Sequence, residues 1–160
     1  MHVTVIYGSD AGATKAVASR IAKKIQGKAI DITAASAADF ENCDLLILGA
    51  PTYGTGDLQS DWEAHIDTLK TANLKNKKVA LFGTGDQVNY PESFVDAMGI
   101  LYDHVVEQGG IVVGFTETDG YDYSASTAER DGKFVGLALD QDNQSSKTDK
   151  RITTWITQLT

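Results

Sequence analysis

Short apolar runs recur along the chain, separated by longer stretches in which polar positions are frequent. Two of these runs, Asp44–Pro51 and Lys77–Gly85, are apolar almost throughout, which is typical of strands buried on both faces of a parallel sheet. Three further runs, His2–Tyr7, Lys28–Ile32 and Ile111–Phe115, also predict strands. The pattern therefore predicts a sheet of five strands.

The stretches between the strands carry apolar residues at helical spacing. After the first strand, Val17, Ile21 and Ile25 share one face of a helix. Ser60, with Glu63 three positions later, has the pattern of a capping box and predicts a helix start. Two more apolar stripes each predict a helix. The first helix has Pro91 in its first turn, and the second is at the C-terminus. Their members are Phe94, Ala97, Met98, Leu101 and Val105 in the first, and Ile152, Trp155, Ile156 and Leu159 in the second.

Strands that alternate with helices predict a three-layer α/β/α sandwich, and the length of 160 residues suits one domain over residues 1–160. The polar stretch Thr116–Gly132 interrupts the fifth strand, which we expect to resume over Lys133–Asp140. This excursion is too small and polar for a second domain. Its Tyr121 and Tyr123 either cover the sheet edge or dock a partner, and the sequence leaves both roles open.

The chain is acidic, with a formal net charge of −8 and a sequence pI of about 4.7. A negative surface repels nucleic acid and anionic lipid and attracts basic partners. No apolar run approaches the ~20 residues of a membrane-spanning helix, and the N-terminus lacks a secretion signal. Cys43 is the only cysteine, so we expect a buried free thiol. These features predict a cytoplasmic protein that binds neither nucleic acid nor membranes.

The loop after the first strand, Gly8–Thr14 (GSDAGAT), enters a helix whose first backbone N–H groups are free to bind an anion. Gly8 and Gly12 allow a tight turn, and Ser9 and Thr14 add hydroxyl groups. The spacing differs from that of the nucleoside-triphosphate loop and of the dinucleotide-binding fingerprint. On its own, the loop is equally compatible with a phosphate cradle and with an ordinary strand-to-helix turn.

Two tyrosines follow neighbouring buried strands. Tyr53 lies just past the third strand, and Tyr90 lies past the fourth. The carboxyl ends of parallel strands meet at one edge of the sheet, where ligands of such folds bind. Each tyrosine alone is compatible with an ordinary loop aromatic, but together they can bracket a flat ring. A phosphate site with two aromatic walls predicts a flavin mononucleotide (FMN).

The chain resembles the flavodoxins of the long-chain type over essentially its whole length. Besides the phosphate loop, the resemblance rests on Pro51–Trp62 (PTYGTGDLQSDW), on Gly83–Tyr90 (GTGDQVNY) followed by FVDAMGILYD, and on Gly132–Gln144 (GKFVGLALDQDNQ). It implies a sheet in the order 2-1-3-4-5 and one non-covalent FMN. It further implies a low-potential one-electron carrier, not an enzyme, that shuttles between semiquinone and hydroquinone. Such a protein would be a monomer that docks on basic faces of redox proteins such as a ferredoxin/flavodoxin-NADP reductase.

The resemblance also implies a set of cofactor contacts in the loops at the strand ends. The phosphate positions are Ser9, Asp10, Ala11, Gly12, Ala13 and Thr14. Thr52 and Asp142 match positions near the ribityl chain, and Thr84, Gly85 and Asp86 match those at the pyrimidine edge. Tyr53 and Tyr90 match the two stacking positions. The remaining expected contacts are Pro51, Gly54, Thr55, Gly56 and Phe94.

Three positions depart from the family pattern. Ala11 stands where threonine is usual, Tyr53 where tryptophan is common, and Asn89 where glycine is frequent. Loss of the threonine hydroxyl removes one bond to phosphate, which should cost on the order of 1–2 kcal/mol of affinity. The resemblance also implies that the Gly54–Thr55 peptide turns its carbonyl toward the flavin N5 and stabilises the semiquinone, and glycine adopts the positive φ that this needs at little cost. The alternative is that Gly54 and Gly56 only form a turn.

Acidic residues near these loops are expected to lower the potential of the second electron transfer. They are Asp57, Asp61, Asp86 and Asp142. Two alternatives differ in class. An FMN-dependent quinone reductase would need a substrate cavity and a nicotinamide contact, neither of which the sequence demands. A signalling receiver domain would need a carboxylate cluster and a lysine after strand five, and the sequence lacks that lysine.

Overall fold

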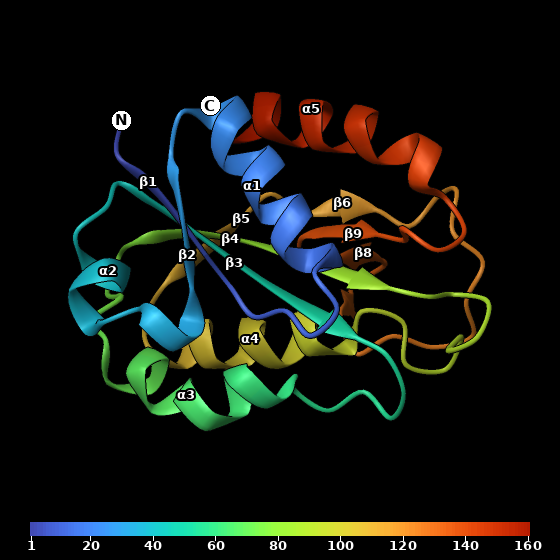
Figure 1. The fold of residues 1–160 in the computed structure, drawn as a ribbon, viewed down its shortest axis with the longest axis horizontal. Helices are drawn as coiled ribbons and strands as arrows, with labels where there is room; N and C mark the ends of the chain where they lie inside the picture. The colour runs from blue at the N-terminus through green and yellow to red at the C-terminus, as the bar shows by residue number, and fades with distance from the viewer.

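Five parallel strands form the centre of the computed structural model, which describes residues 1–160. They are β1 (Val3–Tyr7), β2 (Lys28–Asp31), β3 (Leu45–Thr52), β4 (Lys78–Gly85) and β5 (Ile111–Val113). Their order in the sheet is β2-β1-β3-β4-β5, and every pair is parallel (Figure 1). The predicted strands and their order are therefore confirmed.

Helices cover both faces of the sheet and complete the three layers (Figure 1). On one face lie α1 (Ala13–Ile25) and α5 (Thr148–Leu159), and on the other α3 (Ser60–Thr71) and α4 (Asp96–Glu107). A short helix, α2 (Ala37–Glu41), lies in a stretch to which the sequence assigned no element. None of the helices has the length and apolar character needed to cross a membrane.

Successive strand residues point into two separate cores. Val5 and Ile47 pack with Trp155 on the α1/α5 side, whereas Ile6 and Leu46 face the α3/α4 side. All four strand residues are fully buried. Burial on both faces explains why the central strands carry almost no polar residues.

The fifth strand is split, as predicted. Another strand, β9 (Leu137–Leu139), continues its line: β5 pairs with the first part of β4, and β9 pairs with Phe82–Thr84. Gly114, with φ of +84°, leads the chain away from the sheet after β5. The expectation of one continuous strand over Lys133–Asp140 is wrong, because only its second half rejoins the sheet.

The excursion folds into a small antiparallel sheet in the order β6-β8-β7. Its strands are β6 (Thr116–Glu117), β7 (Glu129–Arg130) and β8 (Lys133–Phe134). Two hydroxyl groups of the excursion donate to carbonyl groups of β9 and of the residue before it: Tyr121 Oη to Ala138 O at 2.5 Å, and Thr116 Oγ1 to Gly136 O at 2.6 Å. Of the two roles left open for Tyr121, the structure shows that it covers the sheet edge.

Two predicted helix starts need correction. The fourth helix begins at Asp96 and not near Pro91, because Val95 has a left-handed backbone with φ of +49°. Helix α3 begins at Ser60 as expected, but its cap is Gln59, whose Oε1 accepts from the Trp62 N–H at 3.2 Å. The predicted capping box is therefore wrong. The buried stripe of α4 after Asp96 is confirmed.

Candidate functional site

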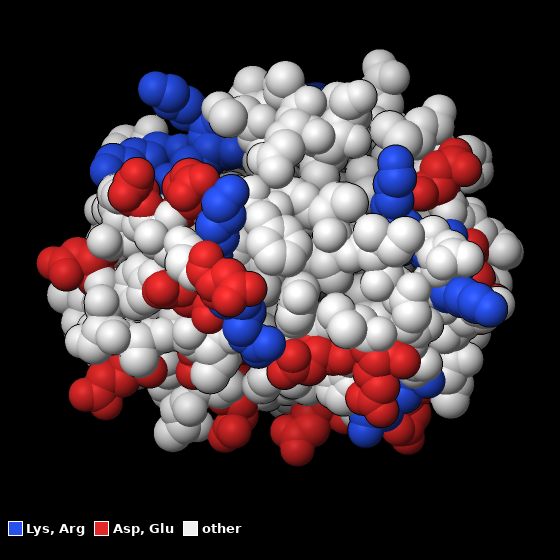
Figure 2. All heavy atoms as spheres, turned by 180° about the vertical axis from the view of Figure 1, so that it is seen from behind, with Lys and Arg blue, Asp and Glu red and all other residues white.

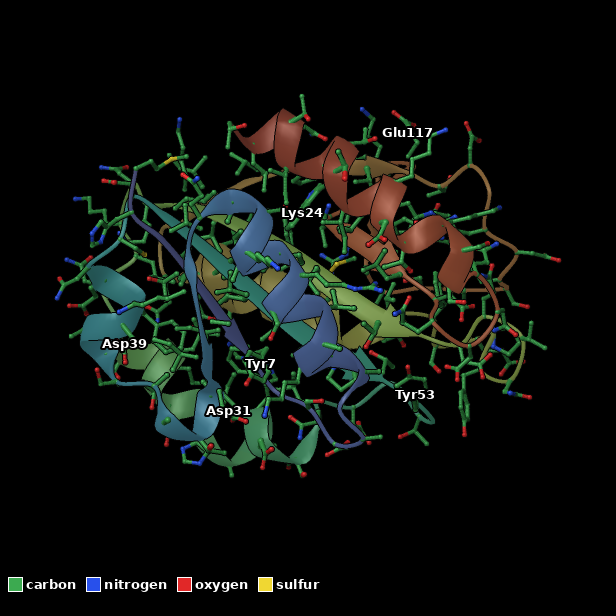
Figure 3. The ribbon with its side chains drawn as sticks, turned by 45° about the horizontal axis from the view of Figure 1, so that its top comes forward. Tyr7, Lys24, Asp31, Asp39, Tyr53 and Glu117 are labelled. Carbon is green, nitrogen blue, oxygen red and sulfur yellow. The ribbon has the colours of Figure 1, made fainter.

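A cavity of about 260 Å³ opens where the parallel strands end. Three segments far apart in the sequence line it: the loop after β1, the end of β3 and the loop after β9. The lining residues are Ser9, Asp10, Ala11, Ala13, Thr14, Pro51, Tyr53 and Asp142. All of them belong to the contacts implied by the sequence resemblance. Figure 3 shows Tyr53 beyond the end of β3, next to the first turn of α1.

The loop between β1 and α1 presents free backbone donors. Gly12, just before α1, has φ of +91°, a left-handed conformation that favours glycine. The Ser9 hydroxyl accepts from the N–H of Gly12 at 3.1 Å and of Lys15 at 3.4 Å. Other N–H groups of the loop have no hydrogen-bond partner within the protein: those of Asp10, Ala11, Ala13 and Thr14. Together with the positive end of the α1 dipole, they favour an anion here.

The start of α3 supports this loop from behind. The Gln59 amide donates to Asp10 Oδ1 at 2.8 Å, and the Trp62 indole donates to the Gly49 carbonyl at 2.9 Å. Gly8 has to be glycine, because a Cβ there would lie 2.3 Å from Gln59 Oε1. The sequence did not single out Gln59 as a site residue. Its only signal was its place in the motif that carries the resemblance.

Three threonines of the predicted set turn their hydroxyls into the protein. Thr14 Oγ1 and Thr84 Oγ1 lie 2.9 Å apart, and both residues are buried. This bond fixes the first turn of α1 to the end of β4. Thr52 accepts from the Ala97 N–H at 2.9 Å and so caps α4. Thr52 was expected near the ribityl chain of a flavin, and accepting from the helix leaves its O–H as a hydrogen-bond donor.

Tyr53 and Tyr90 meet at the mouth of the site. Their ring centroids are 6.3 Å apart, but the planes are inclined by 76°, so the rings meet edge to face rather than in parallel. Tyr53 is 45% exposed and Tyr90 38%, so part of each ring faces solvent. Burial raises the pKa of the Tyr53 phenol to about 12, and the Asp142 carboxylate acts in the same direction. Both walls are thus present, although not in the parallel arrangement expected of a stacking pair.

A buried pair of carboxylates lies behind Tyr90. Asp86 is 5% exposed and Asp140 is fully buried, and neither has a cationic partner. The Asn143 amide nitrogen donates to both, at 2.8 Å to Asp86 and at 2.9 Å to Asp140. Gln87 adds two more donors to Asp140, its backbone N–H and its side-chain amide. The sequence did not identify Asp140, whose only signal was its place in the ALDQDNQ run.

Hydrogen bonds hold the Asp86 carboxylate in its ionised form. Burial acts to raise the pKa of Asp86, but donors from Asn89, Asn143 and Val88 outweigh it, so the pKa lies below the ordinary value. No lysine or arginine lines the cavity. The field at the site is therefore set by carboxylates and by backbone N–H groups.

The glycines after Tyr53 form an open loop. Gly54 has φ of +112° with free space around its missing side chain, whereas a Cβ at Gly56 would lie 2.4 Å from Asp96 Oδ2. The Thr55 hydroxyl donates to Asp57 Oδ2 at 2.8 Å. Gly54, Thr55 and Gly56 do not line the cavity itself, although they directly follow its lining residue Tyr53 in the chain.

The side chain of Phe94 does not reach the site. It is fully buried and packs against the rings of Tyr121, Tyr123 and Phe134, with centroid distances of 5.4–6.0 Å. A Cβ at Gly85 would lie 3.1 Å from the Phe94 ring, so Phe94 supports the end of β4 from inside. The expectation that Phe94 contacts a cofactor is corrected to this supporting role.

Comparison with known proteins identifies the family. The family model described as Flavodoxin matches residues 5–155. The chain belongs to the flavodoxin family. A flavodoxin of Synechocystis sp. is 45% identical over 161 residues, which cover 98% of this chain and 95% of the relative. The flavodoxin of Helicobacter pylori is 42% identical over 158 residues, with the same two shares.

Solved structures of the family have the same fold. The crystal structure of Fusobacterium nucleatum flavodoxin bound to flavin mononucleotide matches with a TM-score of 0.93 and 36% identity, covering 99% of this chain and 96% of that one. The flavodoxin-like fold and the family that the motifs indicated are therefore confirmed. Assignment to the long-chain type stays a prediction.

Proposed function

We propose that this chain binds one FMN non-covalently in the cavity and works as a low-potential one-electron carrier without a substrate reaction of its own. One observation carries the proposal. Three separate loops bring free backbone donors, a tyrosine wall and a carboxylate into one cavity, in a fold shared with an FMN-bound flavodoxin. A quinone reductase would share the cofactor, but no feature of the site favours that enzyme.

The residues of the site fit the two ends of FMN. The free N–H groups of the loop before α1 suit the phosphate, and the Ser9 hydroxyl can add a donor. Tyr53 and Tyr90 suit the flat ring, and Asp142 lines the same cavity as Tyr53 and the phosphate loop. Thr84 and Gly85 are the last residues of β4, and Asp86 follows them at the same edge of the sheet.

Bound FMN would supply the electron chemistry, alternating between its one- and two-electron-reduced states. The protein supplies the electrostatic field. Asp86, Asp140 and Asp142 place negative charge around a site without cations. A carboxylate ~10 Å from a negative ring costs it roughly 1–2 kcal/mol at an effective dielectric near 20. Since about 1.4 kcal/mol corresponds to ~59 mV for one electron, several such charges produce a strong electron donor.

The charge of the whole chain supports transient docking on basic faces of redox proteins, for example a ferredoxin/flavodoxin-NADP reductase. The net charge is −8, and Figure 2 shows Asp and Glu side chains along the lower and left margins of one face. Such encounters are steered by charge and weakened by salt. A buried, unpaired Cys43 agrees with a reducing compartment, and we propose that the protein works as a cytoplasmic monomer.

The test is a visible spectrum recorded during stepwise photoreduction of the purified protein, with FMN added if needed. We expect a yellow protein that first turns blue, as one electron is added, and then becomes pale. A colourless protein that takes up no FMN would overturn the proposal. Oxidation of NADPH with a quinone, without a separate reductase, would instead favour the enzyme.

A further inference from the structure

One hydrogen bond joins the two loops that carry the aromatic walls. The Ser93 hydroxyl donates to the Gly54 carbonyl at 2.6 Å. No other hydrogen bond connects residues 53–58 with residues 86–95. Ser93 is 7% exposed, so water competes little for this contact.

The bond acts close to both rings. Gly54 directly follows Tyr53, and Ser93 closes a turn back to Tyr90, because its N–H donates to the Tyr90 carbonyl at 3.4 Å. The Ser93 side is well anchored, since its own carbonyl accepts from the Asp96 N–H at 3.2 Å. The backbone that follows Tyr53 can change its conformation more easily, because it contains two glycines at positive φ, Gly54 and Gly56.

The distance between the walls is close to what a flat ring needs. A planar ring between two others requires about 7 Å between the outer rings, which is two contacts of about 3.5 Å. The Tyr53 and Tyr90 centroids lie 6.3 Å apart. If the Tyr53 and Tyr90 rings turn parallel and their centroids move slightly farther apart, the space between them is a slot that holds one flat ring. The loops must keep their present spacing for that slot to form.

We propose that Ser93 is a positioning residue that sets the width of the slot between Tyr53 and Tyr90. With oxidised flavin, its hydroxyl holds the glycine-containing loop against the turn after β4 and so determines how tightly the oxidised ring is held. Turning the Gly54 carbonyl toward N5 on reduction would break this bond. Ser93 lies outside the cavity lining and acts through Gly54. The inference rests on the proposed function, because it assigns the ring-binding half of that same site.

The test separates ring binding from phosphate binding in Ser93→Ala. The affinities of the apoprotein for FMN, for lumiflavin and for inorganic phosphate are measured by fluorescence titration and by competition. Loss of one hydrogen bond should weaken FMN and lumiflavin by a similar factor, about 3- to 10-fold, and leave phosphate unchanged. Ser93→Thr keeps the hydroxyl and should restore both flavins. Ser60→Ala, at an exposed serine without a side-chain hydrogen bond, is the matched control.

A lumiflavin affinity in Ser93→Ala equal to that of the wild type would overturn the inference. Equal losses for lumiflavin and phosphate would also overturn it, because they would indicate general damage. If Ser93→Ala does not fold, Ser93→Cys carries the test, since a thiol is a weaker donor and should give an intermediate affinity. A wild-type protein that binds neither flavin would refute the proposed function itself.

Discussion

Ala11 lies in the middle of the phosphate loop, exposed and with a free backbone N–H but no side-chain donor. A threonine there would add a hydroxyl to a loop whose free backbone N–H groups suit an anion. We expect Ala11→Thr to tighten FMN by about 5- to 30-fold, which corresponds to one well-placed hydrogen bond to a charged group. Fluorescence titration of the apoprotein measures this. Riboflavin, which lacks the phosphate, should gain nothing, and an equal gain for riboflavin would contradict the prediction.

Gly54 has a backbone conformation that a β-branched residue does not tolerate, with φ of +112°. Since nothing lies within 4 Å of its missing Cβ, Gly54→Val would act on the backbone and not through a clash. We expect a lower yield of the one-electron-reduced form in a redox titration of FMN-saturated protein. Gly132→Val is the control, because it has φ of +80°, equally open surroundings and a place far from the site. An unchanged yield would refute the role of the Gly54–Thr55 peptide.

Asn143 is the donor that the buried carboxylates share. The pKa of Asp86 is lowered in the folded protein, so Asp86 contributes stability above its ordinary pKa near 4. That contribution is lost as the pH falls through the lowered value. Asn143→Ala should raise the pKa of Asp86, lower the free energy of unfolding at pH 7 by about 1–3 kcal/mol, and move acid unfolding to higher pH.

Urea unfolding at pH 7 and an acid titration followed by circular dichroism would measure both effects. Asn42→Ala is the control, since Asn42 is exposed and makes no side-chain hydrogen bond. An acid midpoint unchanged in Asn143→Ala would show that Asn143 does not determine the ionisation of Asp86.

At the scale of elements, the excursion is bound to the loop after β4 and to the start of α4. Ser126 Oγ donates to the Phe94 carbonyl at 2.5 Å, and the Thr127 N–H donates to Asp96 Oδ1 at 2.8 Å. The Asp122 N–H donates to Gln87 Oε1 at 2.6 Å, which links the excursion to the buried carboxylates. The excursion therefore helps to hold the segment that carries Tyr90.

Gly99 is the point at which α4 and the excursion come closest. A Cβ at Gly99 would lie 2.5 Å from the Thr127 carbonyl oxygen. Alanine normally favours a helix, yet here we expect Gly99→Ala to destabilise the fold by about 1–3 kcal/mol through this clash. Faster hydrogen exchange over residues 122–130 should accompany the loss. Val106→Ala, at an exposed position of the same helix, should change neither the free energy of unfolding nor the exchange rate. A Gly99→Ala variant as stable as the wild type would contradict the close approach of α4 and the excursion.

Hydrophobic patterning was sufficient to predict the five central strands and the buried faces of α1, α3, α4 and α5, because burial leaves a direct trace in the sequence. It did not predict α2 or the short strands of the excursion. The ends of elements were less predictable. The start of α4 depends on the left-handed backbone of Val95, and the division of the last strand depends on which half can pair with β4. Both are decided by tertiary contacts that no local pattern carries.

The candidate site was predictable to a similar extent. The rule that ligands bind at the carboxyl edge of a parallel sheet located the loops of the site. The resemblance supplied the residues that line the cavity and also the order of the strands. The roles of Gln59, Asp140 and Ser93 were not predictable, since each acts through a partner distant in the sequence. Phe94 belongs to the predicted apolar stripe and is fully buried there, so its helical pattern located it better than its place in the resemblance did.

At the scale of the whole molecule, the net charge of −8 should govern the rate of electron transfer to a basic partner. Attraction acts over about 30 Å at 0.01 M salt but only about 8 Å at 0.15 M. We expect the rate with a ferredoxin/flavodoxin-NADP reductase, measured by stopped-flow mixing, to fall several-fold over this range. An uncharged quinone as acceptor should show little change. A rate that rises steadily with salt from the lowest concentration would contradict steering by charge.

The hydroxyl groups that close the β9 edge have a consequence for the protein at high concentration. An open sheet edge offers a row of unpaired groups on which another chain can add a strand and begin a fibril. Here β5 has only three residues, and beyond it the carbonyls of Gly136 and Ala138 already accept from Thr116 and Tyr121. A second molecule therefore finds no long template along this margin. Splitting the last strand gives the sheet a short, partly closed border that resists intermolecular β-pairing.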